Sequence, residues 1–540
     1  MPVNHRNNED GFTMIVTMIG LSVIALLVMV AVTSVNGDAH LTGHDLDQKR
    51  AYDAAQAGIN EYAFHLHVNN GYWAECTKAP APSAGTTNAL NQQGHTDNRR
   101  AVPGDPGAAY AIELIPATGQ TTCNPTNITT ATTSMLESLG TTMKGTFRIR
   151  ATGFVGDAQT SITATFKPAS FLDYVYFTQL ETSDPVTYGS NELIEAAYKQ
   201  CDKTIKNGRT EAEILPGKGY CKVISFVKGD EINGPLHTND AMVICNNPKF
   251  GRSPNDQIEV SAASPGWYST NTKMLHSGSS CSGTPQFVGT YRTKSPPLIP
   301  PATNSKLAQI AEPAFKYKGQ VRICLSGAEM TVNSGNSCTE EGKVLYKGPL
   351  PANGVVYVEA SGPCSSAYTP FGVTYPAGPS ECGNAYVQGS YTGQLTIAAA
   401  NDIIINGSVT KASETGILGL IANNFIRIYH PVPVIAATKT EPEKTECKNA
   451  TGSLENLTVD AAILALNHSF IVDNYECGAS LGKLTIHGAI SQKYRGAVGT
   501  TNGTGYIKNY EYDDRLHTIA PPSFLQPVQA DWVIGRETVG

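Results

Sequence analysis

Twelve cysteines are the residues of this sequence with the most predictable chemistry. None forms a Cys-x-x-Cys pair, and none stands beside a histidine at a spacing typical of zinc ligands. An even number of widely spaced cysteines favours disulfides in an oxidising compartment over buried thiols in a cytosolic protein. Pairing each cysteine with the next would close local loops, but the sequence leaves the connectivity open. The candidates are Cys76, Cys123, Cys201, Cys221, Cys245, Cys281, Cys324, Cys338, Cys364, Cys382, Cys447 and Cys477.

Other combinations of reactive side chains do not add up to a catalytic or metal site. The sequence has no GxSxG, HExxH, phosphate loop or EF-hand loop. His65 and His67 are two apart on a predicted helix and do not share a face. Asp513 and Asp514 are adjacent, so on a strand they would point to opposite faces. We therefore expect no enzyme activity, no catalytic residue, no cofactor and no metal.

Composition supports an exported protein rich in strands and turns. Only 16% of residues are charged, and there are 51 Gly and 32 Pro, which suits short strands better than helical bundles. The net charge is −7 and the basic residues are scattered, so we predict no nucleic-acid partner.

The element that positions everything else is an apolar run over residues 12–35. It contains no Asp, Glu, Lys, Arg, His or Pro. As a helix it would extend roughly 36 Å, enough to cross a bilayer core of about 30 Å. The sequence therefore predicts a transmembrane helix that holds a large extracytoplasmic domain.

The polar leader at 1–11 and the junction that follows it resemble the class III leader of type IV prepilins. That resemblance rests on Gly11-Phe12-Thr13-Met14-Ile15. It implies cleavage between Gly11 and Phe12 by a prepilin peptidase, methylation of Phe12 and retention of the apolar helix. This sequence departs from major pilins at the fifth mature position, where Val16 replaces Glu. Minor pilins and tip pseudopilins share that departure. A plain membrane anchor is the alternative.

Residues 36–70 continue the helix with an amphipathic pattern. Tyr52, Ala55, Ile59, Tyr62 and Leu66 recur at helical spacing. The run at 49–66 resembles the segment that follows the anchor in PilX-type N-terminal domains. Its small residues would let this face pack closely on another element.

Two β regions follow. Residues 71–180 contain alternating runs at 110–116 and 143–168, which predict a small antiparallel sheet over the helix, as in pilins. Residues 181–540 contain short apolar strands between Gly and Asn turns. We interpret them as an irregular right-handed parallel β-helix; a β-sandwich is the alternative. The predicted fold class is thus α+β, with a long N-terminal transmembrane or pilin-like helix, a small antiparallel sheet and a large, mostly β domain.

Two segments of the β domain resemble large exported proteins that carry a PilX-like helix. One is the turn at 232–240, where His237 more plausibly stabilises a turn than catalyses a reaction. The other is the tail at 484–515. There Arg495, Lys508, Asp513 and Arg515 could form an ion-pair cluster, while Tyr494, Tyr506, Tyr510 and Tyr512 would cap the β-helix end. An exposed Tyr/Arg surface for a glycan or partner is the alternative.

The function expected from these features is that of a PilX-type minor pilin or pseudopilin-like protein. It would start as a single-pass precursor in the cytoplasmic membrane and then reach the cell surface or a pilus, with roles in assembly priming or adhesion. Expected partners are the membrane, the prepilin peptidase, other pilin subunits and a surface glycan or host ligand. The alternatives are a membrane-anchored enzyme acting on polysaccharide and a cell-envelope structural protein outside any fibre.

Overall fold

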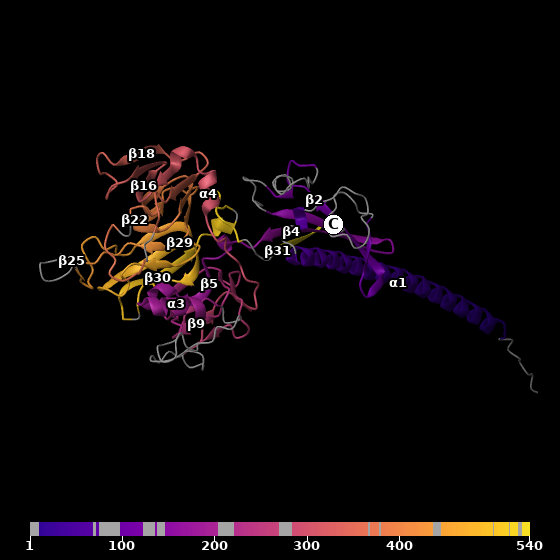
Figure 1. The fold of residues 1–540 in the computed structure, drawn as a ribbon. Coiled ribbons are helices and arrows are strands. Elements are labelled where there is room, and N and C mark those ends of the chain that lie inside the picture. Colours follow the sequence, from indigo (N-terminus) through magenta and orange to yellow (C-terminus); the bar gives the residue numbers. More distant parts are fainter. Residues whose placement is uncertain are drawn as a thin grey trace, which may run out of the picture. The chain divides into compact units, whose positions relative to one another are not determined.

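The structure is a computed structural model of the 540-residue chain (Figure 1). Within α1, the side chains of residues 10–13, 31–42 and 67–68 are not described. The described residues are 10–68, 72–74, 98–121, 135–137, 146–203, 221–268, 283–364, 368–376, 380–435, 444–500, 502–517, 519–527 and 532–539.

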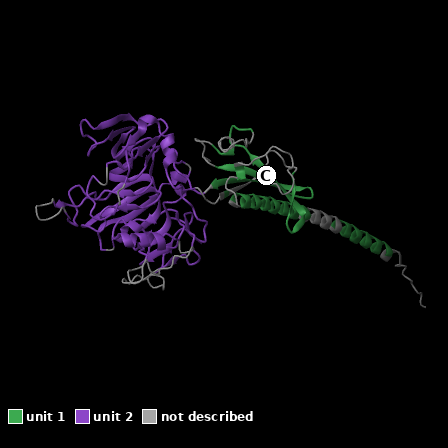
Figure 2. Ribbon diagram, viewed as in Figure 1, with its two compact units in different colours: residues 1–167, 532–540 green, residues 168–531 purple. Residues whose placement is uncertain are grey.

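The chain forms two compact units (Figure 2). Unit 1 comprises residues 1–167 and 532–540, and unit 2 comprises residues 168–531. Unit 2 is therefore an insertion between two strands of unit 1. The sequence predicts a domain boundary at residue 180 and assigns the C-terminal residues to the large β domain. In the structure the boundary lies at residue 168, and residues 532–540 belong to unit 1.

Unit 1 consists of one long helix and a five-stranded sheet of order β1-β2-β3-β4-β31. The first four strands pair antiparallel, with β3 in the centre of the ladder. The alternation of buried and half-exposed residues along β2 and β3 leaves one sheet face for the helix. The elements are α1 (Asp10–Val68), the 3₁₀ turn η1 (Tyr72–Ala74), β1 (Arg100–Val102), β2 (Asp105–Ile115), β3 (Phe147–Val155), β4 (Ala158–Pro168) and β31 (Trp532–Val539).

The predicted transmembrane segment needs correction. The helix α1 is present and spans 59 residues. However, no helix within the described parts of the chain is both long enough and apolar enough to cross a membrane. The prediction of a transmembrane helix over 12–35 is therefore wrong.

The described chain as a whole is mostly β with few helices, which corrects the α+β assignment, while the predicted large β domain fits unit 2. Its helices α3 and α4 have only 10 and 6 residues. The non-strand elements are η2 (Phe171–Asp173), η3 (Pro185–Tyr188), α3 (Asn191–Gln200), α4 (Ser305–Ile310), η5 (Pro313–Phe315) and η6 (Asp514–His517).

The strands of unit 2 are mostly short. They are β5 (Tyr176–Ser183), β6 (Phe226–Val227), β7 (Glu231–Asn233), β8 (Leu236–Thr238), β9 (Met242–Cys245), β10 (Lys249–Phe250), β11 (Gln257–Val260), β12 (Trp267–Tyr268), β13 (Gln286–Phe287), β14 (Thr290–Thr293), β15 (Lys316–Lys318), β16 (Val321–Gly327), β17 (Glu329–Asn333), β18 (Val344–Pro349), β19 (Val355–Glu359), β20 (Ala385–Tyr391), β21 (Gln394–Ala399), β22 (Ile403–Lys411), β23 (Ile417–Ala422), β24 (Ile426–Ile428), β25 (Val434–Ile435), β26 (Lys444–Thr445), β27 (Thr458–Ala465), β28 (Phe470–Val472), β29 (Ser480–Arg495) and β30 (Gly505–Tyr512).

These strands stack in parallel as a β-helix. One face runs β15-β19-β21-β23-β27-β29-β5-β8-β11-β14, with parallel register at every step. A second runs β16-β20-β22-β24-β28. A third includes β27-β29-β30-β7-β10-β13. The parallel β-helix prediction fits this arrangement and the β-sandwich does not, since a sandwich is built from antiparallel pairs. The right-handed sense stays a prediction.

The order of the stack differs from the order of the chain. The first strand, β5, lies in the middle, between β29 and β8. From there the chain winds to β14 at one end, returns through residues 294–315, and winds from β15 at the other end back to β29 and β30. We call residues 168–293 the N-terminal arm and residues 316–517 the C-terminal arm. The two arms meet where β5 and β7 pair with β29 and β30, and we call this junction the seam.

The returning segment explains why the strands of the first face are apolar on both sides. Asn304 donates to the carbonyls of Ala399 and Ile421, and Leu307 beside it is fully buried. The strand residues on this face are therefore covered from outside as well as packed inside, as continuous apolar runs predict.

Candidate functional site

The helix α1 and its contact with the sheet are the candidate functional site of unit 1. Six side chains in its C-terminal half are 0–1% exposed. They repeat at three- and four-residue intervals, so they share one helix face. That face lies on β2 and β3 through an aromatic core in which the Tyr62 ring lies 5.6 Å from the Phe166 ring. The six are Ala51, Ala54, Ala55, Ile59, Tyr62 and Leu66.

Glycine and alanine set the distance between helix and sheet. A Cβ on Gly153 of β3 would lie 1.9 Å from the carbonyl oxygen of Ala51 and 2.6 Å from the backbone nitrogen of Ala55. Only glycine permits this backbone approach. The small residues that the sequence singled out on α1 thus pack against the sheet of their own chain.

Polar contacts fix the position of the helix along the sheet. The Arg50 guanidinium donates to both carboxylate oxygens of Asp105, at 2.6 and 3.2 Å. The hydrogen bond from Arg50 lowers the pKa of Asp105. Gln48 accepts a hydrogen bond from Thr160 at 3.0 Å. These contacts are partly solvated, so they contribute orientation more than stability.

The N-terminal half of α1 has the opposite character. Its large apolar side chains are exposed, from 50% for Val23 to 68% for Leu21. An exposed apolar stretch of this length is unusual for a monomer and marks an interaction surface. We call the described residues Met14–Val30 the apolar half of α1.

The predicted leader junction lies at the start of this helix. The backbone of Gly11 and Phe12 is helical, but their side chains lie outside the described residues. Val16, which stands where major pilins carry Glu, is 52% exposed. The processing site therefore stays a prediction.

Nine of the twelve candidate cysteines lie within the described residues, and all nine are disulfide-bonded. Four bonds have both partners described, and each joins a cysteine to the next cysteine along the chain: Cys201–Cys221, Cys324–Cys338, Cys364–Cys382 and Cys447–Cys477. Cys245 is also disulfide-bonded. Cys76, Cys123 and Cys281 lie outside the described residues.

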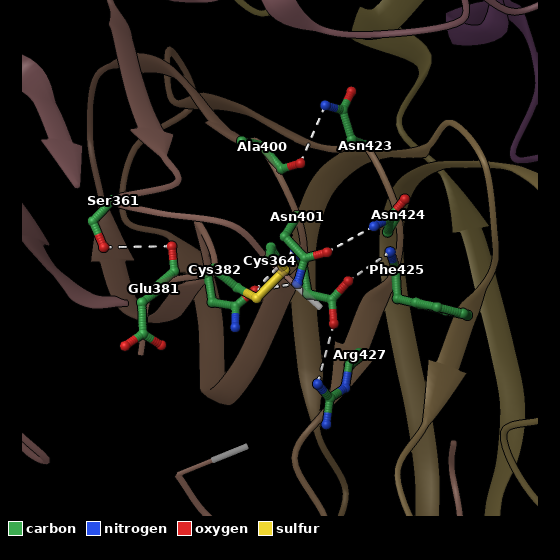
Figure 3. The surroundings of a disulfide bond; sticks show 12 residues. Ser361, Cys364, Glu381, Cys382, Ala400, Asn401, Asn423, Asn424, Phe425 and Arg427 are labelled. Carbon is green, nitrogen blue, oxygen red and sulfur yellow. Dashed lines mark hydrogen bonds and ion pairs between the residues drawn. A yellow bond between two sulfur atoms is a disulfide. The ribbon is translucent and has the colours of Figure 1, made fainter. Parts of the chain in front are cut away.

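The disulfide Cys364–Cys382 lies beside a ladder of stacked asparagines (Figure 3). Asn401 donates to Asn384 at 2.7 Å. Asn424 donates to Asn401 at 2.7 Å (Figure 3). Because each amide donates to the rung beside it, the corner of the β-helix is held in register.

His237 serves as a structural bridge. Its Nδ1 lies 3.1 Å from Glu259 and its Nε2 lies 3.0 Å from Asn239. Asn239 in turn accepts from the backbone N–H of Leu298 and donates to its carbonyl. Burial tends to raise the pKa of Glu259, but hydrogen bonds from His237 and Tyr174 outweigh it and lower that pKa. The histidine thereby ties the N-terminal arm to the returning segment.

The charged residues of the tail do not form one cluster at an end of the β-helix. Arg495 pairs with Glu181 at 3.0 Å, Lys508 with Asp230 at 2.7 Å, and Arg515 with Asp513. The strands β29 and β30 lie in the middle of the stack, where they join the two arms. The segment that the sequence predicts as a C-terminal cap therefore lies at the seam between the two arms. Tyr494, Tyr506, Tyr510 and Tyr512 are buried there, all 6% exposed or less.

Sequence reasoning missed a buried ionic centre in the C-terminal arm. Arg427 pairs with Asp402 at 3.2 Å and with Asp473 at 2.8 Å, and all three are 4% exposed or less. Tyr368 and Tyr375 each donate to Asp473. The three charged residues are far apart in sequence, so no local pattern could have revealed them. Each of the three charged side chains is paired with an opposite charge of the same chain, which indicates a structural role. Among the described residues, no group of three or more His, Cys, Asp or Glu is placed to hold a metal ion.

No family model matches the chain, and no curated protein matches it. Among solved structures, the competence-associated pilin ComZ from Thermus thermophilus is similar, with a TM-score of 0.26 and 11% identity over 92% of this chain and 98% of that chain. A similarity at this level carries no argument about the activity of this chain.

Proposed function

We propose that this chain is a minor-pilin-like subunit of a type IV pilus-related fibre. In this proposal α1 joins the fibre and unit 2 is displayed for assembly priming or adhesion. The observation that carries the proposal is the division of α1 into two halves. One half is packed on its own sheet, and the other exposes an apolar surface that its own chain does not cover.

The apolar half of α1 suits contacts with equivalent helices of neighbouring subunits. Burying such side chains yields about 25 cal/mol per Å² of apolar surface, so association is favoured wherever several of these helices meet. Val16 fits this role as well, because a carboxylate at that position would need a charged partner within the bundle.

The size of unit 2 favours a subunit of low abundance. Its 364 residues (168 to 531) are inserted between two strands of a much smaller sheet domain. A domain of this size on every subunit would hinder close stacking along a fibre, so we place the protein at a tip or as an occasional subunit. The partners proposed on this basis are other pilin subunits, the prepilin peptidase that removes residues 1–11, and a surface ligand of unit 2. Unit 2 acts in this proposal as a binding or structural domain and not as an enzyme.

Site-specific photo-crosslinking in cells tests the proposal. A photoreactive amino acid at Leu21, which is 68% exposed, should crosslink to other fibre subunits. The matched control is the same substitution at Ile507, an apolar side chain of unit 2 that is 51% exposed. Adducts from position 21 but not from position 507 support the proposal. A protein that yields no subunit adduct from position 21, in cells that assemble fibres, contradicts it.

A further inference from the structure

The seam of the β-helix differs chemically from the other contacts between its strands. Seven pairs of acidic and basic side chains among the described residues connect the N-terminal arm to the C-terminal arm: five are ion pairs of Lys or Arg with a carboxylate, and two are aspartate–histidine contacts. By contrast, no ion pair of the described residues joins the strands β19, β21, β23 and β27 to one another, and that ladder is held by stacked aliphatic side chains such as Ile397, Leu420 and Ile463. The seam pairs are Asp173–His517, Asp184–His468, Glu181–Arg495, Asp202–Lys493, Asp230–Lys508, Glu231–Lys483 and Arg252–Asp514.

The seam pairs range from fully buried to largely exposed. The side chains of Arg495 and Glu181 are 1% and 0% exposed, whereas those of Lys483 and Glu231 are 54% and 48% exposed. Buried pairs give little net stability, because desolvation offsets their attraction. Exposed pairs contribute little and are screened by salt. The seven seam pairs therefore stabilise the contact between the arms less than their number suggests.

Some buried polar atoms at the seam lack a partner. Within the described residues, Arg495 Nη2, Thr182 Oγ1 and Ser491 Oγ make no hydrogen bond. All three belong to the paired strands β5 and β29. A buried polar group without a partner costs free energy relative to the open state, where water can reach it. Hydration of these three polar atoms favours opening of the seam. A ladder of aliphatic side chains gains no such hydration when it opens.

The topology makes opening at the seam possible without unwinding either arm. The chain passes from one arm to the other through residues 294–315, and none of the four disulfides whose partners are both described joins the arms. Within unit 2 the arms meet elsewhere through the ladders β5·β29 and β30·β7 and the contacts around them. Breaking the two ladders separates two stacks that each keep their internal pairing.

We propose that the seam is a built-in joint, at which the two arms of the β-helix separate locally before any other parallel ladder of unit 2 opens. The inference does not depend on the proposed function of the chain. Opening exposes the backbone edges of β5 and β29, and it changes the direction in which the two ends of the β-helix point.

Hydrogen exchange of the full chain, followed by mass spectrometry, tests the proposal. Amides in the β5·β29 ladder (residues 176–180 and 490–494) should exchange faster than those in the β23·β27 ladder (residues 419–422 and 462–465), which serves as the internal reference. Raising NaCl from 0.05 to 1 M shortens the screening length from about 14 Å to about 3 Å. The ratio of seam to reference exchange should therefore rise with salt. Equal or slower exchange at the seam, or a ratio that is independent of salt, overturns the proposal.

A matched pair of variants separates the seam from a general loss of charge. Lys483→Ala removes an exposed seam pair, and Lys448→Ala removes an exposed pair with Glu446 within the C-terminal arm. Lys483→Ala should raise seam exchange about two- to five-fold, which is the size expected for an exposed ion pair, while Lys448→Ala leaves it unchanged. Equal effects of the two variants contradict a specific joint.

Discussion

The close approach of α1 to β3 makes Gly153→Ala the sharpest test of how unit 1 is built. The added Cβ would lie 1.9 Å from the Ala51 carbonyl oxygen and 2.6 Å from the Ala55 nitrogen, and both are backbone atoms. No side chain can move aside to relieve the overlap. The helix must shift from the sheet by more than an ångström, which loosens the contacts of Ala55, Ile59 and Tyr62.

The expected cost is at or above the upper end of the range for an overpacked core. Such substitutions typically cost about 1–3 kcal/mol, and here the clash is with backbone on both sides. We therefore expect the free energy of unfolding of unit 1 to fall by about 3 kcal/mol or more. The control is Gly43→Ala, on the same helix, where a Cβ meets nothing within 4 Å. There the gain in helix propensity should stabilise by up to about 1 kcal/mol.

The assay is hydrogen exchange of β3 peptides in a urea series, which reports the unfolding of unit 1 within the full chain. A Gly153→Ala protein whose free energy of unfolding lies within about 0.5 kcal/mol of the wild-type value would contradict this expectation. It would mean that the helix does not lie on this sheet as described. A loss of the same size in Gly43→Ala would mean that the cost of Gly153→Ala does not come from the overlap with the backbone of α1.

Three further predictions concern unit 2. Arg495→Ala leaves Glu181 buried and unpaired, so we expect the free energy of unfolding in a denaturant titration to fall by about 3–5 kcal/mol. The double variant Glu181→Leu with Arg495→Met leaves no unpaired charge and should lose clearly less. Equal losses in the two variants would contradict the pairing. Removing the Cys447–Cys477 bond by paired serine substitutions should cost about 3–4 kcal/mol for a loop of 30 residues, and an unchanged denaturation midpoint would argue against the bond. Burial tends to lower the pKa of His487, but hydrogen bonds to Asp460 and Glu511 outweigh it and raise that pKa. The stabilisation from His487 is therefore fully present below about pH 6.5 and is lost as the pH rises through the raised pKa. The difference in Tm between wild type and His487→Gln should consequently shrink from pH 6 to pH 9. A Tm difference that grows over this range would contradict the prediction.

The sequence was informative where the pattern is local. The spacing of Ala55, Ile59, Tyr62 and Leu66 identified the buried face of α1, because helical periodicity depends only on neighbouring turns. Tyr52, the first residue of that predicted pattern, is 39% exposed and lies off this face. Pairing each cysteine with the next in sequence matches the four bonds whose partners are described. The continuous apolar runs of β21 and β23 indicated strands covered on both sides, and Asn304 and Leu307 of the returning segment cover them.

Local pattern failed where distant segments meet. Nothing near Tyr176 shows that its strand pairs with β29, because Tyr176 and Gln492 are 316 residues apart. The same holds for β31, which completes the sheet of unit 1 after the whole of unit 2. The tail was consequently expected to cap an end of the β-helix, although its strands join the two arms. The transmembrane prediction relied on apolar composition alone, which does not distinguish a helix that crosses a membrane from one that packs on other helices.

The proposed function depends most on a retained N-terminal helix that begins at Phe12 and joins a fibre. Mass spectrometry of the protein recovered from sheared surface fibres measures this directly. If the proposed function is correct, the N-terminal peptide starts at a methylated Phe12 and continues into the apolar half of α1. A protein that is absent from the fibres, or one that keeps Met1 or starts beyond Gly37, would contradict it.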